Sequence, residues 1–154
     1  MRTMQYTRRA ALAAAIGLAL AGCGMMGDHK SESASRSGSG GERVTLSGGN
    51  EVPAVQTGAS GNGTVSVAAD GSVSVNITVS GMTPTAAHIH QGAAGANGPV
   101  IVPLAKSGDN TFVAPPGAKM SEAHLAAYRA GNTYVNVHSA KNPGGEIRAQ
   151  LKGR

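Results

Sequence analysis

The sequence is poor in cysteine, in aromatic residues and in charge. Its 154 residues include one cysteine, no tryptophan, one phenylalanine and only 14% charged residues. A single cysteine excludes a disulfide within the chain, so a folded domain must be stabilised by its apolar core, or by a core together with a metal. Because aromatic side chains are so few, valine, isoleucine, leucine and alanine must supply most of that core.

The longest apolar run, from Ala10 to Ala21, is too short to span a bilayer stably. It follows three arginines and ends in Leu-Ala-Gly-Cys, a layout typical of an export signal with a small-residue cleavage site. This ending resembles the bacterial lipobox, which implies cleavage before Cys23 and diacylglycerol on its sulfur. An ordinary secretory signal is the alternative. We therefore interpret residues 1–22 as a lipoprotein signal peptide.

Two details extend the export hypothesis. Arg8 and Arg9 resemble a twin-arginine signal, which implies export of the folded protein, and the general secretory route is the alternative. Gly24 follows the cysteine at the position where an aspartate would favour retention in the inner membrane. We therefore expect an exported chain that is anchored in the lipid bilayer through Cys23, on the periplasmic side of the outer membrane or on the cell surface.

Residues 23–42 are predicted to comprise the lipidated cysteine and a flexible linker, because they are mainly glycine, serine and charged residues. His29 lies in this linker and is interpreted as a solvated side chain. Three of the 13 Lys and Arg residues belong to the signal peptide, which leaves ten against eight Asp and Glu, a net charge of +2. Much of the net positive charge of the full chain therefore lies in the signal peptide, and we expect no nucleic-acid partner.

From residue 43 to residue 154 apolar and polar residues alternate with a period of two, which is typical of β-strands. The clearest run extends from Val73 to Val79, and Asp70-Gly71 before it predicts a hairpin turn. Residues 99–104 are bounded by prolines and are predicted to form a strand near a sheet edge. About seven or eight short strands with turns at this spacing predict an all-β domain, a Greek-key β-sandwich.

Two segments depart from the strand pattern. One short helix is predicted from Ser121, as the N-cap, through Ala130, with Gly131 as the stop. Leu125 and Tyr128 would form its apolar face. The segment around the single phenylalanine, Phe112, is assigned to a longer connection between strands.

Three histidines are placed so that they could form one cluster. His88 and His90 flank Ile89 in a predicted strand, and His138 follows two valines in another strand, Tyr134 to His138. Successive side chains of a strand alternate between its two faces, so the three imidazoles belong to the face opposite the isoleucine and the valines. If the two strands are neighbours, the imidazoles converge. This pattern predicts a metal site formed by His88, His90 and His138.

The donor type narrows the choice of metal. Imidazole suits copper, zinc and nickel, and an exported site without thiolates suits Cu(II) well, so copper is the expected metal. Three histidines with an open position also suit zinc, which is the alternative. Because neutral imidazole is the ligand, binding should weaken as the pH falls through about 6.5. Four candidates for a fourth ligand remain open, namely water, Met82, Met120 and His124.

Three polar residues are candidates for supporting the ligands. Glu146 and Arg148 share the polar face of a strand that is predicted to pair with the strand of His138. Glu146 would orient an imidazole, and Arg148 would attract anions, or the two would pair with each other across solvent. Asn136 would take part in the metal site or in a hydrogen-bond network that sets the turn geometry without a metal.

Three segments together resemble the CHRD domain, the type first named in chordin. They are Leu46-Ser47-Gly48-Gly49-Asn50-Glu51-Val52-Pro53, Ala87-His88-Ile89-His90-Gln91-Gly92, and Tyr134 to Ser139 continued by Asn142 to Arg148. The resemblance covers nearly all of residues 43–151 and implies that residues 43–154 form a CHRD-like domain. It implies little about activity.

A more distant resemblance is to copper–zinc superoxide dismutase, which is also a Greek-key sandwich. Both have a His-x-His strand before a glycine-rich loop and a late strand that carries a third histidine. This similarity implies that His88, His90 and His138 are copper ligands. The chain departs from that enzyme after His90, where the histidine-rich stretch and the aspartate that would form a zinc site are lacking. It also lacks the disulfide pair.

These observations lead us to expect a membrane-anchored lipoprotein that binds copper and acts in copper handling or as a weak redox site, with an envelope protein or a copper donor as partner. A non-catalytic interaction or structural module of the cell envelope is the alternative. A minimal copper-only superoxide dismutase is the one enzymatic function that the sequence supports. Ser139 beside His138 is no catalytic triad, because adjacent strand residues face opposite ways.

Overall fold

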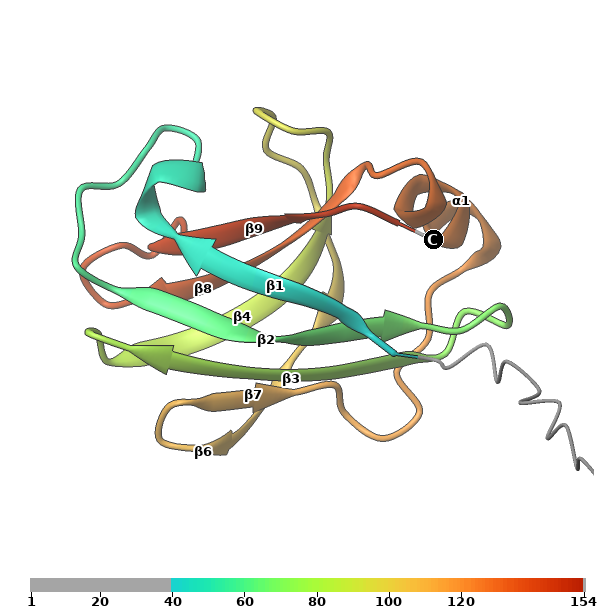
Figure 1. Cartoon of the computed structure of the whole chain (residues 1–154), viewed down its shortest axis with the longest axis horizontal. Helices are drawn as coiled ribbons and strands as arrows, with labels where there is room; N and C mark the ends of the chain where they lie inside the picture. The colour runs from blue at the N-terminus through green and yellow to red at the C-terminus, as the bar shows by residue number, and fades with distance from the viewer. Residues whose placement is uncertain (1–39, 154) are drawn as a thin grey trace, which may run out of the picture. The chain divides into compact units, whose positions relative to one another are not determined.

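The computed structural model describes residues 40–153, which form nine strands, one short 3₁₀ helix and one α-helix (Figure 1). The predicted signal peptide (residues 1–22), Cys23, His29 and most of the linker lie outside the described residues. The elements are β1 (Glu42–Ser47), η1 (Gly48–Asn50), β2 (Ser60–Val67), β3 (Val73–Ser80), β4 (Pro84–Gln91), β5 (Val100–Pro103), β6 (Ala105–Gly108), β7 (Thr111–Val113), α1 (Glu122–Arg129), β8 (Thr133–Ser139) and β9 (Ile147–Leu151). Within residues 40–153, no helix has the length and hydropathy that crossing a membrane requires.

The strands form one antiparallel sheet in the order β5-β4-β8-β9-β1-β2-β3-β7-β6. The sheet folds over, so that β1, β2 and β3 lie in front of β4, β8 and β9 (Figure 1). Pairing of β1 with β9, where Ser47 lies opposite Arg148, joins the two halves of the sandwich into a continuous sheet. The predicted all-β fold is confirmed, as is the edge position of the strand predicted at residues 99–104, which corresponds to β5.

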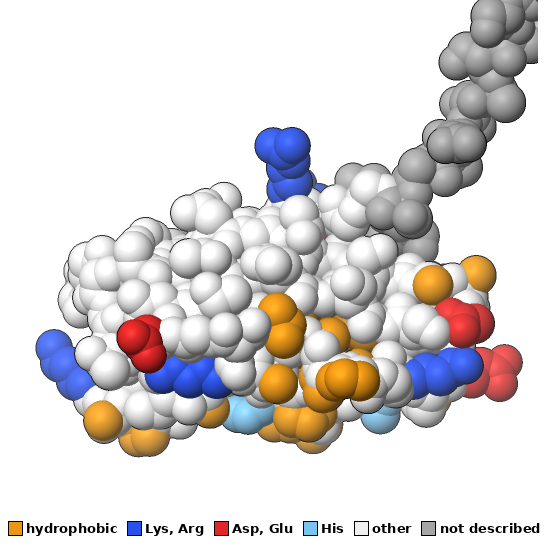
Figure 2. Space-filling model, turned by 90° about the horizontal axis from the view of Figure 1, so that it is seen from below, with side chains coloured by type: hydrophobic (Ala, Val, Ile, Leu, Met, Phe, Trp, Pro, Cys, Tyr) orange, Lys and Arg blue, Asp and Glu red, His pale blue; other side chains and the backbone are white. Residues whose placement is uncertain are grey.

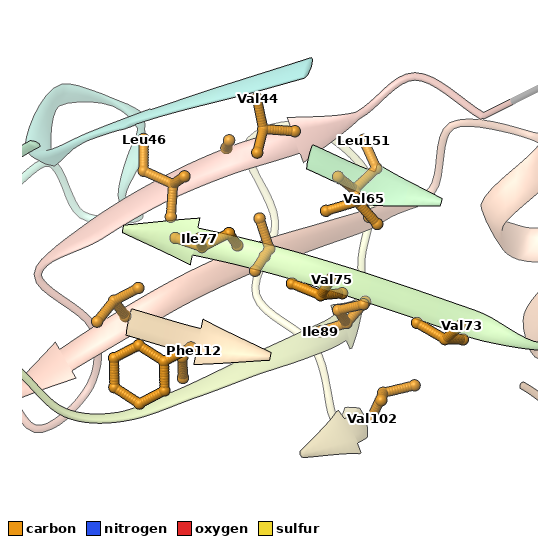
Figure 3. Close-up of a cluster of buried hydrophobic side chains, with 14 of the residues drawn as sticks. Val44, Leu46, Val65, Val73, Val75, Ile77, Ile89, Val102, Phe112 and Leu151 are labelled. Carbon is orange, nitrogen blue, oxygen red and sulfur yellow. The ribbon is translucent and has the colours of Figure 1, made fainter. Parts of the chain in front are cut away.

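The hydrophobic core lies between the two halves of the sheet (Figure 3). Ile77 from one half and Ile89 from the other are completely buried, as the period-two pattern requires. Phe112 is also buried, and its assignment to a connection was wrong, because it lies in β7 opposite Ile77 of β3. The short β6–β7 hairpin was missed because most of its residues are small or polar, with Phe112 as its one large apolar side chain.

The predicted helix is confirmed as α1. Ser121 is its N-cap, and its Oγ accepts a hydrogen bond from the His124 backbone N–H at 3.2 Å. Leu125 and Tyr128 are buried and dock the helix on the core. Gly131 follows with φ +73°, a left-handed conformation that glycine adopts without steric strain and that ends the helix.

The N-cap provides a local test of the fold. Replacing Ser121 with alanine removes the acceptor for the His124 N–H and should lower the free energy of unfolding by about 1 kcal/mol. Urea unfolding followed by circular dichroism measures the change. The control is Ser74→Ala on the exposed face of β3, which should change stability by less than about 0.5 kcal/mol. Equal effects of the two substitutions would contradict a capping role.

Candidate metal centre

The structure brings the three predicted histidines together on the outer face of the sheet. β4 and β8 pair directly, with His88 opposite Asn136 and His138 opposite Ala86. One ring nitrogen from each of His88, His90 and His138 lies within 4.8 Å of those of the other two. The apolar residues that alternate with this face, namely Ile89, Val135 and Val137, are completely buried and belong to the hydrophobic core, so the imidazoles lie on the opposite face of the sheet.

Backbone carbonyls fix the proton positions on two of the rings. The Nδ1 of His90 lies 2.9 Å from the Gly98 carbonyl oxygen, and the Nδ1 of His138 lies 2.9 Å from that of Pro143. A carbonyl oxygen only accepts hydrogen bonds, so each Nδ1 carries the proton and each Nε2 of the neutral ring has a free lone pair. The Nε2 of His90 is buried and has no hydrogen-bond partner within residues 40–153.

The third donor comes from His88. Its Nδ1 lies 3.0 Å from the Nε2 of His138. Because that Nε2 has no proton to give, the His88 Nδ1 donates here, and for a metal ion to bind at this nitrogen the proton would move to the Nε2 of His88, so that the ring stays neutral. The donor set is therefore Nδ1 of His88 with Nε2 of His90 and of His138. The unpartnered buried Nε2 of His90, close to the Nε2 of His138 and the Nδ1 of His88, fits a divalent metal that prefers imidazole.

The surroundings of His88 and His138 favour the neutral form of these two rings. Burial lowers the pKa of His88, and the neighbouring His138 and His90 lower it further. Burial also lowers the pKa of His138, although the hydrogen bond to the Pro143 carbonyl partly opposes this. His88 is only half-buried, whereas His90 and His138 are buried. Figure 2 shows that histidine side chains reach the surface on one side of the molecule. The cluster is thus compatible with metal binding, and solvent reaches it through His88.

A stack of three side chains supports His90. Its ring lies parallel to the Tyr134 ring at a centroid distance of 4.8 Å, and the Arg148 guanidinium lies 3.3 Å from the Tyr134 centroid. Arg148 also donates hydrogen bonds to the Ala96 carbonyl oxygen at 2.8 Å and to Asn97 Oδ1 at 3.1 Å. Both acceptors belong to the glycine-rich loop, residues 92–98, whose last carbonyl holds His90. Arg148 therefore orients the loop and the ring together.

This arrangement changes the roles that we expected for two residues. Arg148 is 1% exposed and bound to carbonyls, so it is not an anion attractor at the surface. Glu146 is also buried, and its carboxylate accepts hydrogen bonds from Thr57 Oγ1 at 2.7 Å and from Ser139 Oγ. Pairing of Glu146 with Arg148 across solvent was therefore wrong, because the glycine-rich loop covers Arg148 and two hydroxyl groups satisfy Glu146.

The candidates for a fourth protein ligand lie elsewhere. Met120 belongs to the hydrophobic core and Met82 packs against it, whereas the imidazoles occupy the outer face of the sheet. His124 lies in α1 and is not part of the three-histidine group. Of the four candidates, water is therefore the one that could occupy the fourth ligand position of the metal.

Asn136 is buried directly opposite His88, in the middle of the polar face. The sequence did not single out its neighbour, Glu51, whose side chain is buried after η1. Burial raises the pKa of Glu51, although the positive charge of Arg148 and the nearby side-chain amide of Asn136 oppose this. The one cue in the sequence was a carboxylate placed directly before Val52-Pro53 in an otherwise uncharged turn.

Comparison with known families gives a match to a domain family. Residues 43–151 match the family model of the CHRD domain, a segment that includes the three histidines, Asn136, Glu51 and Arg148. No curated protein and no solved structure matches the chain.

Proposed function

The chain belongs to the CHRD domain family, and we propose that this member binds a metal ion, copper in preference to zinc, through His88, His90 and His138. The observation that carries the proposal is the buried Nε2 of His90, which has no partner among the described residues and lies beside the ring nitrogens of the other two histidines. Leaving such an atom unpaired is unfavourable, and a metal ion would satisfy it.

The preference for copper rests on the donor chemistry. Three neutral imidazoles without a thiolate or carboxylate match Cu(II), which binds nitrogen donors more strongly than zinc does. When bound, copper would supply one-electron redox chemistry at this face. The residues of the chain hold and orient the donors, because the Gly98 and Pro143 carbonyls fix two of the three rings.

The proposed cellular role rests on the export signal that the sequence predicts. We propose that acylated Cys23 anchors the domain in the lipid bilayer, at the outer membrane or on the cell surface, where it handles copper. An envelope protein that donates or receives copper is the partner that fits this role. The lipobox-like ending at Cys23 and the linker after it support the anchoring.

The proposal is tested by titrating the detergent-solubilised, metal-free chain with Cu(II) and with Zn(II) in a calorimeter. We expect one Cu(II) per chain, bound more tightly than Zn(II), and an EPR spectrum with nitrogen hyperfine structure. Affinity no better than that of a short peptide with one histidine would end the metal hypothesis and direct attention to protein partners.

The pH dependence of binding is a second expected result. Because burial lowers the pKa of His88 and His138, both rings stay neutral below about pH 6.5, the ordinary histidine value. The sequence alone led us to expect weaker binding from about pH 6.5 downward, whereas the lowered pKa values imply that copper affinity persists through pH 6.5 and declines only at lower pH. Titrations at pH 7.5, 6.5 and 5.5 measure this. A peptide with three solvated histidines serves as the control, and a parallel decline of protein and peptide would contradict the prediction.

A further inference from the structure

Four buried side-chain atoms have no hydrogen-bond partner within residues 40–153. They are Nε2 of His90, Oδ1 of Asn136, Oε1 of Glu51 and Oγ1 of Thr133. The proposed metal ion would account for the first. Buried polar atoms nearly always have a partner, so the oxygen atoms of Asn136 and Glu51, two residues that contact the same glycine, also need an explanation.

Glu51 determines which way the Asn136 amide points. A Cβ atom on Gly145 would lie 2.6 Å from Glu51 Oε1 and 2.7 Å from Asn136 Nδ2, so both atoms border the same glycine. An ionised carboxylate only accepts hydrogen bonds, and the amide therefore turns its Nδ2 toward Glu51. Gly145, with φ +132°, leaves the space in which the two side chains meet.

The other branch of the amide is then free on the face that carries the imidazoles. Asn136 lies directly opposite His88 and two residues before His138 on the same face of β8. Side chains directly opposite each other on antiparallel strands have Cβ atoms about 4.5–5.5 Å apart. Asn136 is thus a direct neighbour of the histidines, and its Oδ1 is a buried acceptor that has no partner within residues 40–153.

We propose that Asn136 Oδ1 accepts a hydrogen bond from a water molecule, or another small protic oxygen ligand, at the open position of the metal, and that Glu51 is a positioning residue that fixes the amide. This inference rests on the proposed function. Three imidazoles leave a position free for such a ligand. An acceptor there favours ligands that carry a proton and disfavours anions that carry none, so the site selects against ligands such as azide.

Azide binding to the copper-loaded full chain tests the proposal. Replacing Asn136 with leucine keeps a similar volume and removes the acceptor, so the dissociation constant for azide should fall about tenfold, as one hydrogen-bonding difference predicts. The azide-to-copper charge-transfer absorption measures binding without any activity assay. Asn76→Leu, at an exposed position of β3, is the matched control and should leave azide affinity unchanged.

Glu51→Gln tests the positioning role separately. A glutamine side chain can donate to Asn136 as well as accept from it, so the amide is free to rotate and azide should bind about threefold more tightly, with copper stoichiometry unchanged. If Asn136→Leu fails to fold, Glu51→Gln alone still tests whether the Asn136 amide controls azide affinity. Unchanged azide affinity in the folded variants would overturn the inference and leave the copper proposal intact. Absence of copper binding in the unaltered chain would overturn both.

Discussion

Replacing His88 and His138 together with alanine should lower the affinity for Cu(II) by more than about a thousandfold. The double substitution removes two of the three nitrogens that lie within 4.8 Å of one another and leaves His90 alone. Loss of a supporting residue around a metal typically costs ten- to a hundredfold in affinity, and loss of two direct ligands must exceed this. Calorimetric titration with Cu(II) measures the change.

The double variant should remain folded, because neither histidine belongs to the hydrophobic core. Circular dichroism and thermal unfolding of the metal-free protein verify this. His124→Ala is the matched control, because His124 lies in α1 outside the cluster and its loss should leave copper affinity unchanged. A double variant that binds copper as the unaltered chain does would show that the metal lies elsewhere.

The histidine cluster could be predicted because strand periodicity is local information. His88 and His90 must share a face wherever their strand lies, and the same holds for His138 relative to Val135 and Val137. The one non-local assumption was that the two strands are neighbours, and β4 pairs with β8. The tautomers could not be predicted, because the carbonyls that set them belong to loops whose path depends on the whole fold.

Residues whose roles depend on a covering loop were harder to predict. Arg148 occupies a polar position of β9 and would be exposed on an open sheet, yet the glycine-rich loop folds over it and buries it. Glu51 illustrates the same limit, since it follows η1 and reaches Asn136 only because Gly145 leaves room. Sequence alternation specifies a face, and long-range loop packing decides what covers that face.

Replacing Arg148 with leucine should lower the free energy of unfolding by about 3 kcal/mol, the second large effect that we expect. The substitution removes the stacking of the guanidinium on Tyr134 and the hydrogen bonds to the Ala96 carbonyl and to Asn97 Oδ1. Hydrogen bonds from a charged donor contribute about 1.5–3 kcal/mol each, and a buried cation–π contact adds to them. Urea unfolding of the metal-free protein measures the loss.

The same variant should lower copper affinity about tenfold, because the glycine-rich loop that Arg148 holds also supplies the Gly98 carbonyl for His90. Arg43→Leu, at an exposed position of β1, is the control and should change neither property appreciably. Buried charges are sometimes replaced by apolar side chains with a gain in stability. If Arg148→Leu is more stable and binds copper equally well, the arginine does not organise the loop, and the orientation of His90 must depend on Tyr134 and the Gly98 carbonyl alone.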